Sequence, residues 1–215
     1  MKKTVLTVIG VICAAIVFAN GGQYEKAMAK NIPAMFQAGD AESLLGAINQ
    51  LNRVGDAEAD KWEPYYYAAF GYIRMIAMTE SAEEKDKYLD QALEIIKKGE
   101  TIKPADSELE SLRGYVHMMR VTIDPATRGM QYSGLAFNSF NKAIALDANN
   151  ARAHYLLGRM QFGTAQFMGN GDGGACESFA KAKSLFESGS NTENQFAPSW
   201  GLDSTKEAMQ QMCEG

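Results

Sequence analysis

The sequence is poor in the residues that most often carry out catalysis or hold metals. It contains only two histidines, His117 and His154, and neither stands at a metal-ligand spacing from cysteines or carboxylates. It lacks a Gly-x-Ser-x-Gly motif, and no serine, histidine and aspartate form a recognisable catalytic set. These absences predict a protein that is not an enzyme and that carries no cofactor and no metal.

Positive charge is in short supply as well. The chain has 21 Lys and Arg residues against 26 Asp and Glu residues, which gives a formal net charge of −5. A nucleic-acid-binding protein needs a basic stripe to displace counterions from phosphates, and an acidic chain argues against this class. We therefore expect no nucleic-acid partner.

Long apolar runs are absent beyond the N-terminus. One apolar run covers residues 5–18, after Lys2 and Lys3 and before the small residue Ala19. This is the pattern of a secretory signal peptide, and the run is too short to span a bilayer comfortably. The sequence thus predicts a signal peptide over residues 1–19 and a periplasmic or otherwise exported chain, 20–215, without a transmembrane span. A retained N-terminal anchor is the alternative.

Cysteine is scarce in the exported part of the chain. Of three cysteines, Cys13 falls within the signal peptide, which leaves Cys176 and Cys213 on two predicted helices. Disulfides persist outside the cytoplasm, so a bridge that pins the C-terminal helix to the preceding helix is one interpretation. Two buried free thiols are the other, and the sequence leaves both open.

Strand-type alternation is also missing, and almost every segment has the pattern of an amphipathic helix. Three glycines within these helices, Gly71, Gly114 and Gly158, stand 43 and 44 residues apart. A glycine inside a helix costs up to about 1 kcal/mol relative to alanine, so a recurring one needs a packing reason. We expect a neighbouring helix to approach closely at each of the three.

The helical segments resemble tetratricopeptide repeats (TPRs). The stretch "NARAHYLLGRMQF" looks like the first helix of such a repeat, and "AFNSFNKAIALDANN" looks like the second. Ala136, Phe140 and Ala143 match the family's second-helix pattern of a small, a large and a small residue. The 22 residues from Ala136 to Gly158 match the family's spacing. The turns within the pairs are longer than in the family.

The resemblance implies one all-α domain, a right-handed TPR-like solenoid of antiparallel helix pairs with lengthened turns inside the repeats. An end repeat would expose its apolar face, so a terminal cap is expected. The expected parts are an N-terminal helix pair (23–53), three repeats (64–104, 107–148 and 151–188) and a C-terminal capping helix (203–214).

In this family the first helices of the repeats line a concave groove that holds peptides. Tyr, Met and Arg are enriched at interface hot spots, so such a groove suits a protein or peptide partner. The sequence therefore predicts a bacterial cell-envelope scaffold or adaptor. Two alternatives stay open: a small-ligand or glycan-binding protein that uses the groove tyrosines, and a groove filled by the lengthened helices or by the C-terminal segment. The resemblance places ten residues in the groove: Tyr65, Tyr72, Met75, Glu108, Tyr115, Met118, Arg152, Tyr155, Arg159 and Phe162.

The glycine-rich stretch "FMGNGDGGACESF" is the clearest candidate for a phosphate-binding loop. A Walker-type loop needs a preceding strand and a Lys after the glycines, and this stretch has neither. Two oxygen side chains, Asn170 and Asp172, are too few for a calcium site. We interpret the stretch as a long turn in which Asp172 caps the next helix.

Other local signals concern single side chains. Ser81 with Glu84, and Ser204 with Glu207, have the spacing of capping boxes at helix starts.

Two side chains in connecting segments have expected roles of their own. Arg128, within an expected insertion, is predicted to reach into solvent. Trp200 is predicted to pack the last helix over the exposed end of the stack.

Overall fold

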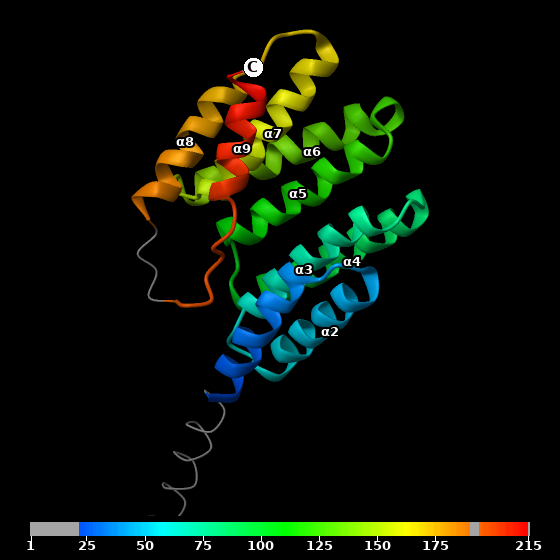
Figure 1. Ribbon diagram of the computed structural model, residues 1–215, viewed down its shortest axis with the longest axis vertical. Helices are drawn as coiled ribbons and strands as arrows, with labels where there is room; N and C mark the ends of the chain where they lie inside the picture. Colours follow the sequence, from blue (N-terminus) through cyan, green and yellow to red (C-terminus); the bar gives the residue numbers. More distant parts are fainter. Residues whose placement is uncertain (1–21, 190–193, 215) are drawn as a thin grey trace, which may run out of the picture.

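The computed structural model describes residues 22–189 and 194–214, which form helices joined by turns, with no strand among them (Figure 1). The expected signal peptide, residues 1–19, lies outside the described residues. The helices are residues 22–37, α2 (Ala41–Ala57), α3 (Glu63–Met75), the 3-10 turn η1 (Ile76–Met78), α4 (Ala82–Ile102), α5 (Ser107–Ile123), α6 (Pro125–Leu146), α7 (Ala151–Met168), α8 (Ala175–Ser188) and α9 (Leu202–Met212).

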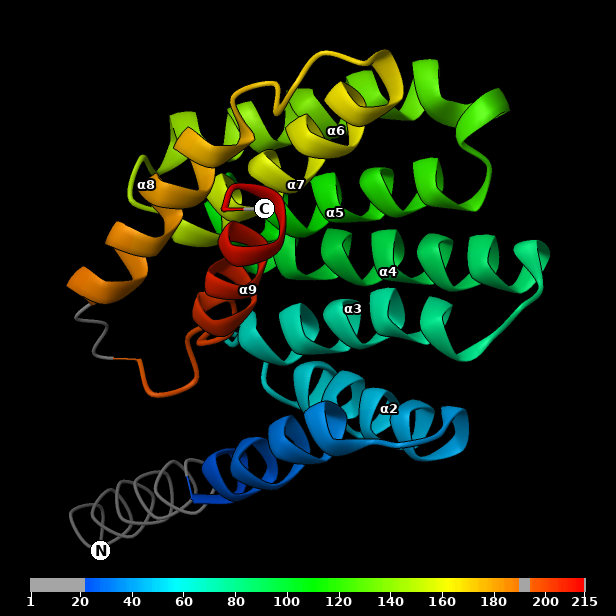
Figure 2. The ribbon, with the colours of Figure 1, turned by 45° about the horizontal axis from the view of Figure 1, so that its top comes forward.

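Successive helices pack as antiparallel pairs, and the pairs stack into a solenoid (Figure 2). Residues 22–37 pair with α2, α3 with α4, α5 with α6, and α7 with α8, while α9 packs on α7 and α8. This arrangement confirms the all-α solenoid expected from the sequence. Much of the extra length expected within the pairs is helical, since α4 has 21 residues and α6 has 22.

The recurring glycines have the packing role that their spacing predicts. A Cβ atom on Gly71 would lie 2.5 Å from Ile48, and one on Gly114 would lie 2.5 Å from Phe140. These distances are far below van der Waals contact. A large side chain of the neighbouring helix fills the space at each glycine and draws the two helix axes together, as also happens at Gly158.

One expected helix cap is present in part and the other is wrong. The Ser81 hydroxyl accepts a hydrogen bond from the Glu84 amide over 3.3 Å, but the Glu84 carboxylate contacts the Thr79 hydroxyl instead of returning to Ser81. Ser204 is not a cap, because α9 begins at Leu202, two residues earlier, after Gly201 and without a side-chain cap.

The glycine-rich stretch is a turn, as predicted. Gly169, Gly171, Gly173 and Gly174 all have positive φ, a conformation that residues with a Cβ rarely adopt. Gly174 holds the cap position of α8, and the Asp172 carboxylate accepts from the Cys176 amide over 3.1 Å.

The expectation for Arg128 is wrong. It does not reach into solvent; both of its terminal nitrogens donate to the Asp86 carboxylate, over 2.7 and 2.8 Å. This two-point contact joins α6 to α4, because the insertion that carries Arg128 is helical and lies over α4.

Two hydrophobic clusters make up the core. One joins residues 22–37, α2, α3, α4 and the first half of α5, and the other joins α5 to α9. Within the described residues, none of the helices has the length and apolar character to cross a membrane.

Candidate functional site

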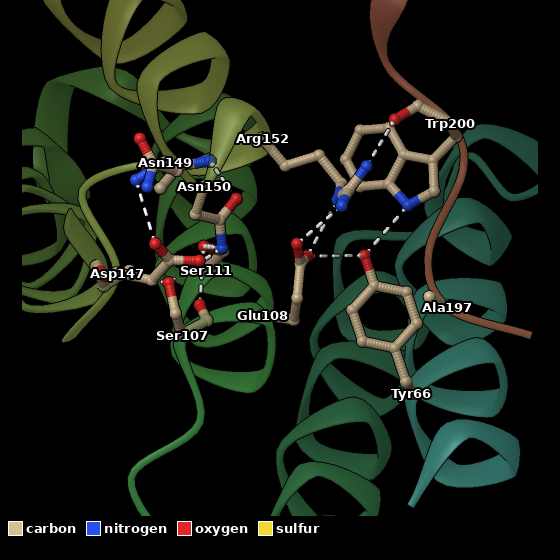
Figure 3. A network of polar contacts seen from close by, with 12 residues as sticks. Tyr66, Ser107, Glu108, Ser111, Asp147, Asn149, Asn150, Arg152, Ala197 and Trp200 are labelled. Atoms are coloured by element: carbon tan, nitrogen blue, oxygen red, sulfur yellow. Dashed lines mark hydrogen bonds and ion pairs between the residues drawn. The ribbon is translucent and has the colours of Figure 1, made fainter. Parts of the chain in front are cut away.

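The centre of the site is a buried polar network on α3, α5 and α7 (Figure 3). Arg152 donates to both oxygens of Glu108, from Nε over 2.8 Å and from Nη2 over 2.6 Å. The Tyr66 hydroxyl lies 3.4 Å from the same carboxylate and donates to it. The planar guanidinium matches the carboxylate at two points, so the pair holds α5 and α7 in a fixed relation.

Residues 196–201 lie across this network. We call the surface beneath them the inner face and define it by Tyr66, Tyr67, Phe70, Glu108 and Arg152. The Trp200 ring stacks on Phe70, with ring centroids 4.6 Å apart. Its indole Nε1 donates to the Tyr66 hydroxyl over 2.9 Å. The half-buried ring thus packs on an aromatic surface while its one polar atom has a hydrogen-bond partner.

The inner face also binds the backbone of this segment. The Tyr67 hydroxyl donates to the carbonyl of Ala197 over 3.1 Å, and Arg152 Nη1 donates to the carbonyl of Trp200 over 3.1 Å. These contacts recognise carbonyl groups rather than particular side chains. The alternative in which the C-terminal segment fills the groove is therefore the arrangement that the structure has.

The tyrosines and the arginine of the inner face keep their ordinary charge at neutral pH. Burial, and then the Glu108 charge, raise the pKa of Tyr66 well above its ordinary value, and burial raises the pKa of Tyr67 to about 12. Burial alone would lower the pKa of Arg152, but the Glu108 carboxylate beside it raises that pKa. The tyrosines therefore stay neutral hydrogen-bond donors and the arginine stays charged.

A pocket of 360 Å³ opens beside the inner face, between the C-terminal ends of α3 and α5. This volume falls within the range of small-molecule sites. Most of the lining is apolar, and two cations complete it. The lining residues are Ile73, Arg74, Ile76, Ala77, Met78, Lys85, Tyr115, Met119, Thr122 and Ile123.

Arg74 and Lys85 are the only charged residues that line this pocket. Arg74 donates to the backbone carbonyls of Met35 and Phe36, where the helix over 22–37 ends. Neither cation forms an ion pair with a carboxylate in the part of the chain that the structure describes. Burial lowers the pKa of Arg74, as expected for a charge held without an anion.

Tyr115 connects the pocket to the inner face. Its ring lines the pocket and lies 6.4 Å from Phe70 and 6.5 Å from Trp200, centroid to centroid. Burial raises the pKa of Tyr115, which keeps its hydroxyl neutral. A ligand that extended past the pocket would therefore meet an aromatic surface.

A second pocket, of 540 Å³, lies between α2 and α4 and differs in its charges. Lys98 pairs with Asp56 over 2.8 Å, and Lys97 pairs with Glu94 over 2.7 Å. Because these charges already have partners, a ligand would gain little by pairing with them. The pocket beside Tyr115 is the stronger candidate.

Part of the predicted groove is assembled on α5 and α7. Glu108, Tyr115 and Arg152 meet at or beside the inner face, and Arg159, which is exposed, donates to the Tyr155 hydroxyl over 3.0 Å. Phe162 is half-buried against the second core cluster, and Tyr155 is buried within that cluster.

The other four predicted groove residues lie elsewhere. Tyr65 faces α2 and lines the pocket between α2 and α4, and Tyr72 stacks on Tyr88 of α4 with ring centroids 6.4 Å apart. Met75 and Met118 are buried in the core. The structure thus does not bring these four residues to the inner face.

The residues of α3 that do face inward were missed. Tyr66, Tyr67 and Phe70 form a stripe at helical spacing, on the side of α3 away from Tyr65 and Tyr72. Every residue of α3 except Arg74 is buried, because α2 and α4 cover one side and residues 196–200 cover much of the other. The sequence did carry a signal for this: α3 has aromatic residues on both of its sides, which indicates that both sides are buried.

The last helix is tied covalently to the stack. Cys176 and Cys213 form a disulfide with their Cα atoms 5.8 Å apart, which joins α8 to the end of α9. Of the two interpretations left open by the sequence, the structure has the bridge. The expectation for Trp200 needs correction: it anchors on the inner face of α3, and α9 itself covers α7 and α8.

Comparison with known proteins identifies the class of fold. No protein-family model and no curated protein matches the chain. The HusA haemophore from Porphyromonas gingivalis has a similar structure, with a TM-score of 0.78 and 22% identity over 89% of this chain and 93% of that chain. A thermophilic TPR protein from Thermus thermophilus gives a TM-score of 0.52 and 22% identity, over 82% and 88% of the two chains. The protein therefore has a TPR-like α-solenoid fold.

The site combines hydrogen-bond donors, aromatic rings and an apolar pocket with two cations. The described residues contain no group of three or more His, Cys, Asp or Glu side chains placed to hold a metal ion. The inner face supplies hydrogen-bond donors and aromatic rings, and the pocket supplies apolar walls and two cations. These are the components of a site that recognises a molecule by shape and charge.

Proposed function

We propose that this protein is a non-enzymatic binding protein for a small apolar ligand that bears acidic groups, held in the pocket beside Tyr115. One observation carries the proposal: the pocket is lined by apolar side chains and by two cations, Arg74 and Lys85, and by no carboxylate. In a chain with net charge −5, a pocket with this charge pattern favours an anion.

Each part of the pocket would contribute differently to binding. The apolar walls, such as Ile73 and Met119, favour a hydrophobic body by removing it from water. A ligand carboxylate would form charge-assisted hydrogen bonds with Arg74 or Lys85, which are stronger than neutral ones. The ring of Tyr115 offers a face for a flat ligand.

Porphyrins are the first ligands to test. Protoporphyrin IX is a flat apolar ring that carries carboxylates, so its chemistry fits the lining, and the similar HusA protein is a haemophore. A ring larger than the pocket would extend over Tyr115 towards the aromatic cluster of the inner face.

The test is a fluorescence titration of the full chain with protoporphyrin IX and with its dimethyl ester. We expect the acid to bind at least tenfold more tightly than the ester, because a hydrogen bond to a charged group contributes about 1.5–3 kcal/mol. Lys85→Gln should weaken binding of the acid about tenfold and leave binding of the ester unchanged. Lys87→Gln, two residues along and exposed, is the matched control.

Two results would contradict this function. No binding of either porphyrin, nor of a long-chain fatty acid, would remove the pocket as a ligand site. Equal binding of acid and ester, with no effect of Lys85→Gln, would remove the role of the cations and leave only apolar attraction.

A protein or peptide partner is the second candidate, in line with the adaptor function expected from the sequence. The observation that favours it is that the inner face already holds a stretch of polypeptide, residues 196–200, by two of its carbonyl groups. Solenoids commonly use such extended faces for partners. Binding of an isolated peptide to the inner face, measured by fluorescence polarisation, tests this candidate.

We also propose that the protein acts outside the cytoplasm, in the cell envelope. The apolar run at residues 5–18 and the Cys176–Cys213 disulfide support this, since disulfides persist in oxidising compartments. N-terminal sequencing of the protein from a periplasmic fraction should give a chain that starts at Asn20. Recovery of the uncleaved chain from the cytoplasm alone would contradict export.

A further inference from the structure

The segment Phe196–Trp200 occupies the inner face in the way that a bound peptide would. Its two aromatic residues are seated at opposite ends: Phe196 packs edge-on against Tyr24 with ring centroids 5.4 Å apart, and Trp200 stacks on Phe70. Phe196 is 9% exposed. Two aromatic anchors four residues apart therefore hold this segment.

Between the anchors, the inner face binds the segment through its main chain. Tyr67 donates to the carbonyl of Ala197 and Arg152 donates to the carbonyl of Trp200. Any extended polypeptide presents such carbonyls, so these donors do not require that the segment belong to the same chain. Pro198 lies between these two residues in sequence, is buried, and has no amide hydrogen to leave unpaired.

The covalent tether keeps the segment in place. α9 begins at Leu202, directly after the segment, and Cys213 at its far end is bonded to Cys176 on α8. A segment whose C-terminal side is restrained in this way has a high effective concentration at its own site and excludes a competing peptide. The contacts that hold Phe196–Trp200 on the inner face and the disulfide that restrains it are therefore separate, and substitutions can remove either one alone.

We propose that the inner face is a peptide-binding groove, occupied in cis by Phe196–Trp200, and that it fits a partner segment with two aromatic residues four positions apart. This inference rests on the second candidate function, a protein or peptide partner. The groove supplies aromatic contact surfaces at Tyr24 and Phe70 and two hydrogen-bond donors for backbone carbonyls, and the partner replaces the chain's own segment at these points.

The experiment measures binding of a fluorescein-labelled peptide, Asn-Gln-Phe-Ala-Pro-Ser-Trp-Gly (residues 194–201), to the full chain by fluorescence polarisation. The open variant is Phe196→Ala with Trp200→Ala, and Cys176→Ser with Cys213→Ser is a second way to weaken the internal competitor. Phe167→Ala, which removes an aromatic ring that is 77% exposed on α7, is the matched control with a closed groove.

We expect the open variant to bind the peptide at least tenfold more tightly than the wild type or the Phe167→Ala protein. Adding Arg152→Gln to the open variant should weaken binding at least tenfold, since it removes the donor to the second carbonyl. Circular dichroism melting establishes that each variant is folded; if the open variant is not, the disulfide-free protein gives the same comparison.

The outcomes distinguish this inference from the proposed peptide-binding function on which it rests. If peptides with alanine at both aromatic positions bind the open variant equally well, the groove binds peptides but the aromatic requirement is overturned. If a folded open variant and the disulfide-free protein bind none of the peptides, the inference and the peptide-binding function both fall. Porphyrin binding by the same proteins tests the pocket independently.

Discussion

At the scale of single residues, a side chain's role depends on what the neighbouring helix places against it. Gly114 shows this, because the Phe140 ring of α6 occupies the space where a Cβ would lie. Gly134, within α6, has no such neighbour within 4 Å. The same residue type is therefore a packing requirement at one position and a weak point of the helix at the other.

We predict opposite effects of alanine at these two positions. Gly114→Ala should destabilise the protein by about 1–3 kcal/mol, because the added methyl group forces apart two closely packed helices. Gly134→Ala should leave stability unchanged or raise it by up to about 1 kcal/mol, through helix propensity. Urea denaturation followed by circular dichroism measures both. Equal effects of the two substitutions would show that Phe140 moves aside at no cost.

A second residue-scale prediction concerns His117. Burial, and then the nearby Arg120 and Arg113, lower the pKa of His117 below its ordinary value of 6.5, and its Nδ1 is buried without a hydrogen-bond partner in the structure. The unfolded chain takes up a proton near pH 6.5 while the folded chain does not, so stability falls as the pH drops through 6.5 towards the folded pKa.

His117→Gln should remove that part of the pH dependence. The measurement is the free energy of unfolding at pH 7.5 and pH 5.5 for both proteins. The capping carboxylates of Asp40 and Asp172 do not interfere, because hydrogen bonds from backbone amides lower the pKa of each below its ordinary value of 3.8. If the free energy of unfolding changes between pH 7.5 and pH 5.5 by as much in the variant as in the wild type, groups other than His117 cause the pH dependence.

At the scale of elements, the helices were predictable and their orientations were less so. Periodicity and spacing located the pairs, since apolar stripes and the recurring glycines are local signals. The inward faces of α5 and α7 also followed from the repeat pattern, as Glu108 and Arg152 show. For α3 the pattern failed, because the segment that covers Tyr66 and Tyr67 lies about 130 residues away in sequence.

The helix starts give an element-scale prediction. Ser81→Ala should destabilise the protein by about 1 kcal/mol, because the Glu84 amide at the start of α4 loses its acceptor. Ser204→Ala should have no measurable effect, since α9 begins at Leu202 and Ser204 caps nothing. Thermal melting of the two variants in parallel distinguishes them. A loss at Ser204 equal to that at Ser81 would contradict the observed start of α9.

At the scale of the whole molecule, the C-terminal segment joins helices that the repeat architecture keeps apart. Asn194 contacts Glu63 at the start of α3, Trp200 reaches Phe70 and Arg152, and Cys213 returns to α8. In a simple solenoid each repeat contacts only its neighbours. Here one connecting segment, residues 194–201, adds contacts that span three helix pairs; we call this segment the strap.

The disulfide gives a prediction at this scale. It closes a loop between residues 37 apart in sequence, and Cys176→Ser with Cys213→Ser should destabilise the protein by about 4 kcal/mol in the chain-entropy model. The midpoint of urea denaturation should fall accordingly, and a reductant should shift the wild type to the same midpoint. A reductant effect on the double variant would point to a cause other than this bond.

The strap also has a consequence for how the chain matures. Its hydrogen bonds to α3 join residues 130 and 134 positions apart, which raises the contact order of a fold otherwise built from local pairings. During synthesis, the N-terminal half emerges with the Tyr66, Tyr67 and Phe70 surface uncovered until the last residues leave the ribosome. A nascent chain of this kind completes its fold only when residues 196–200 have been made.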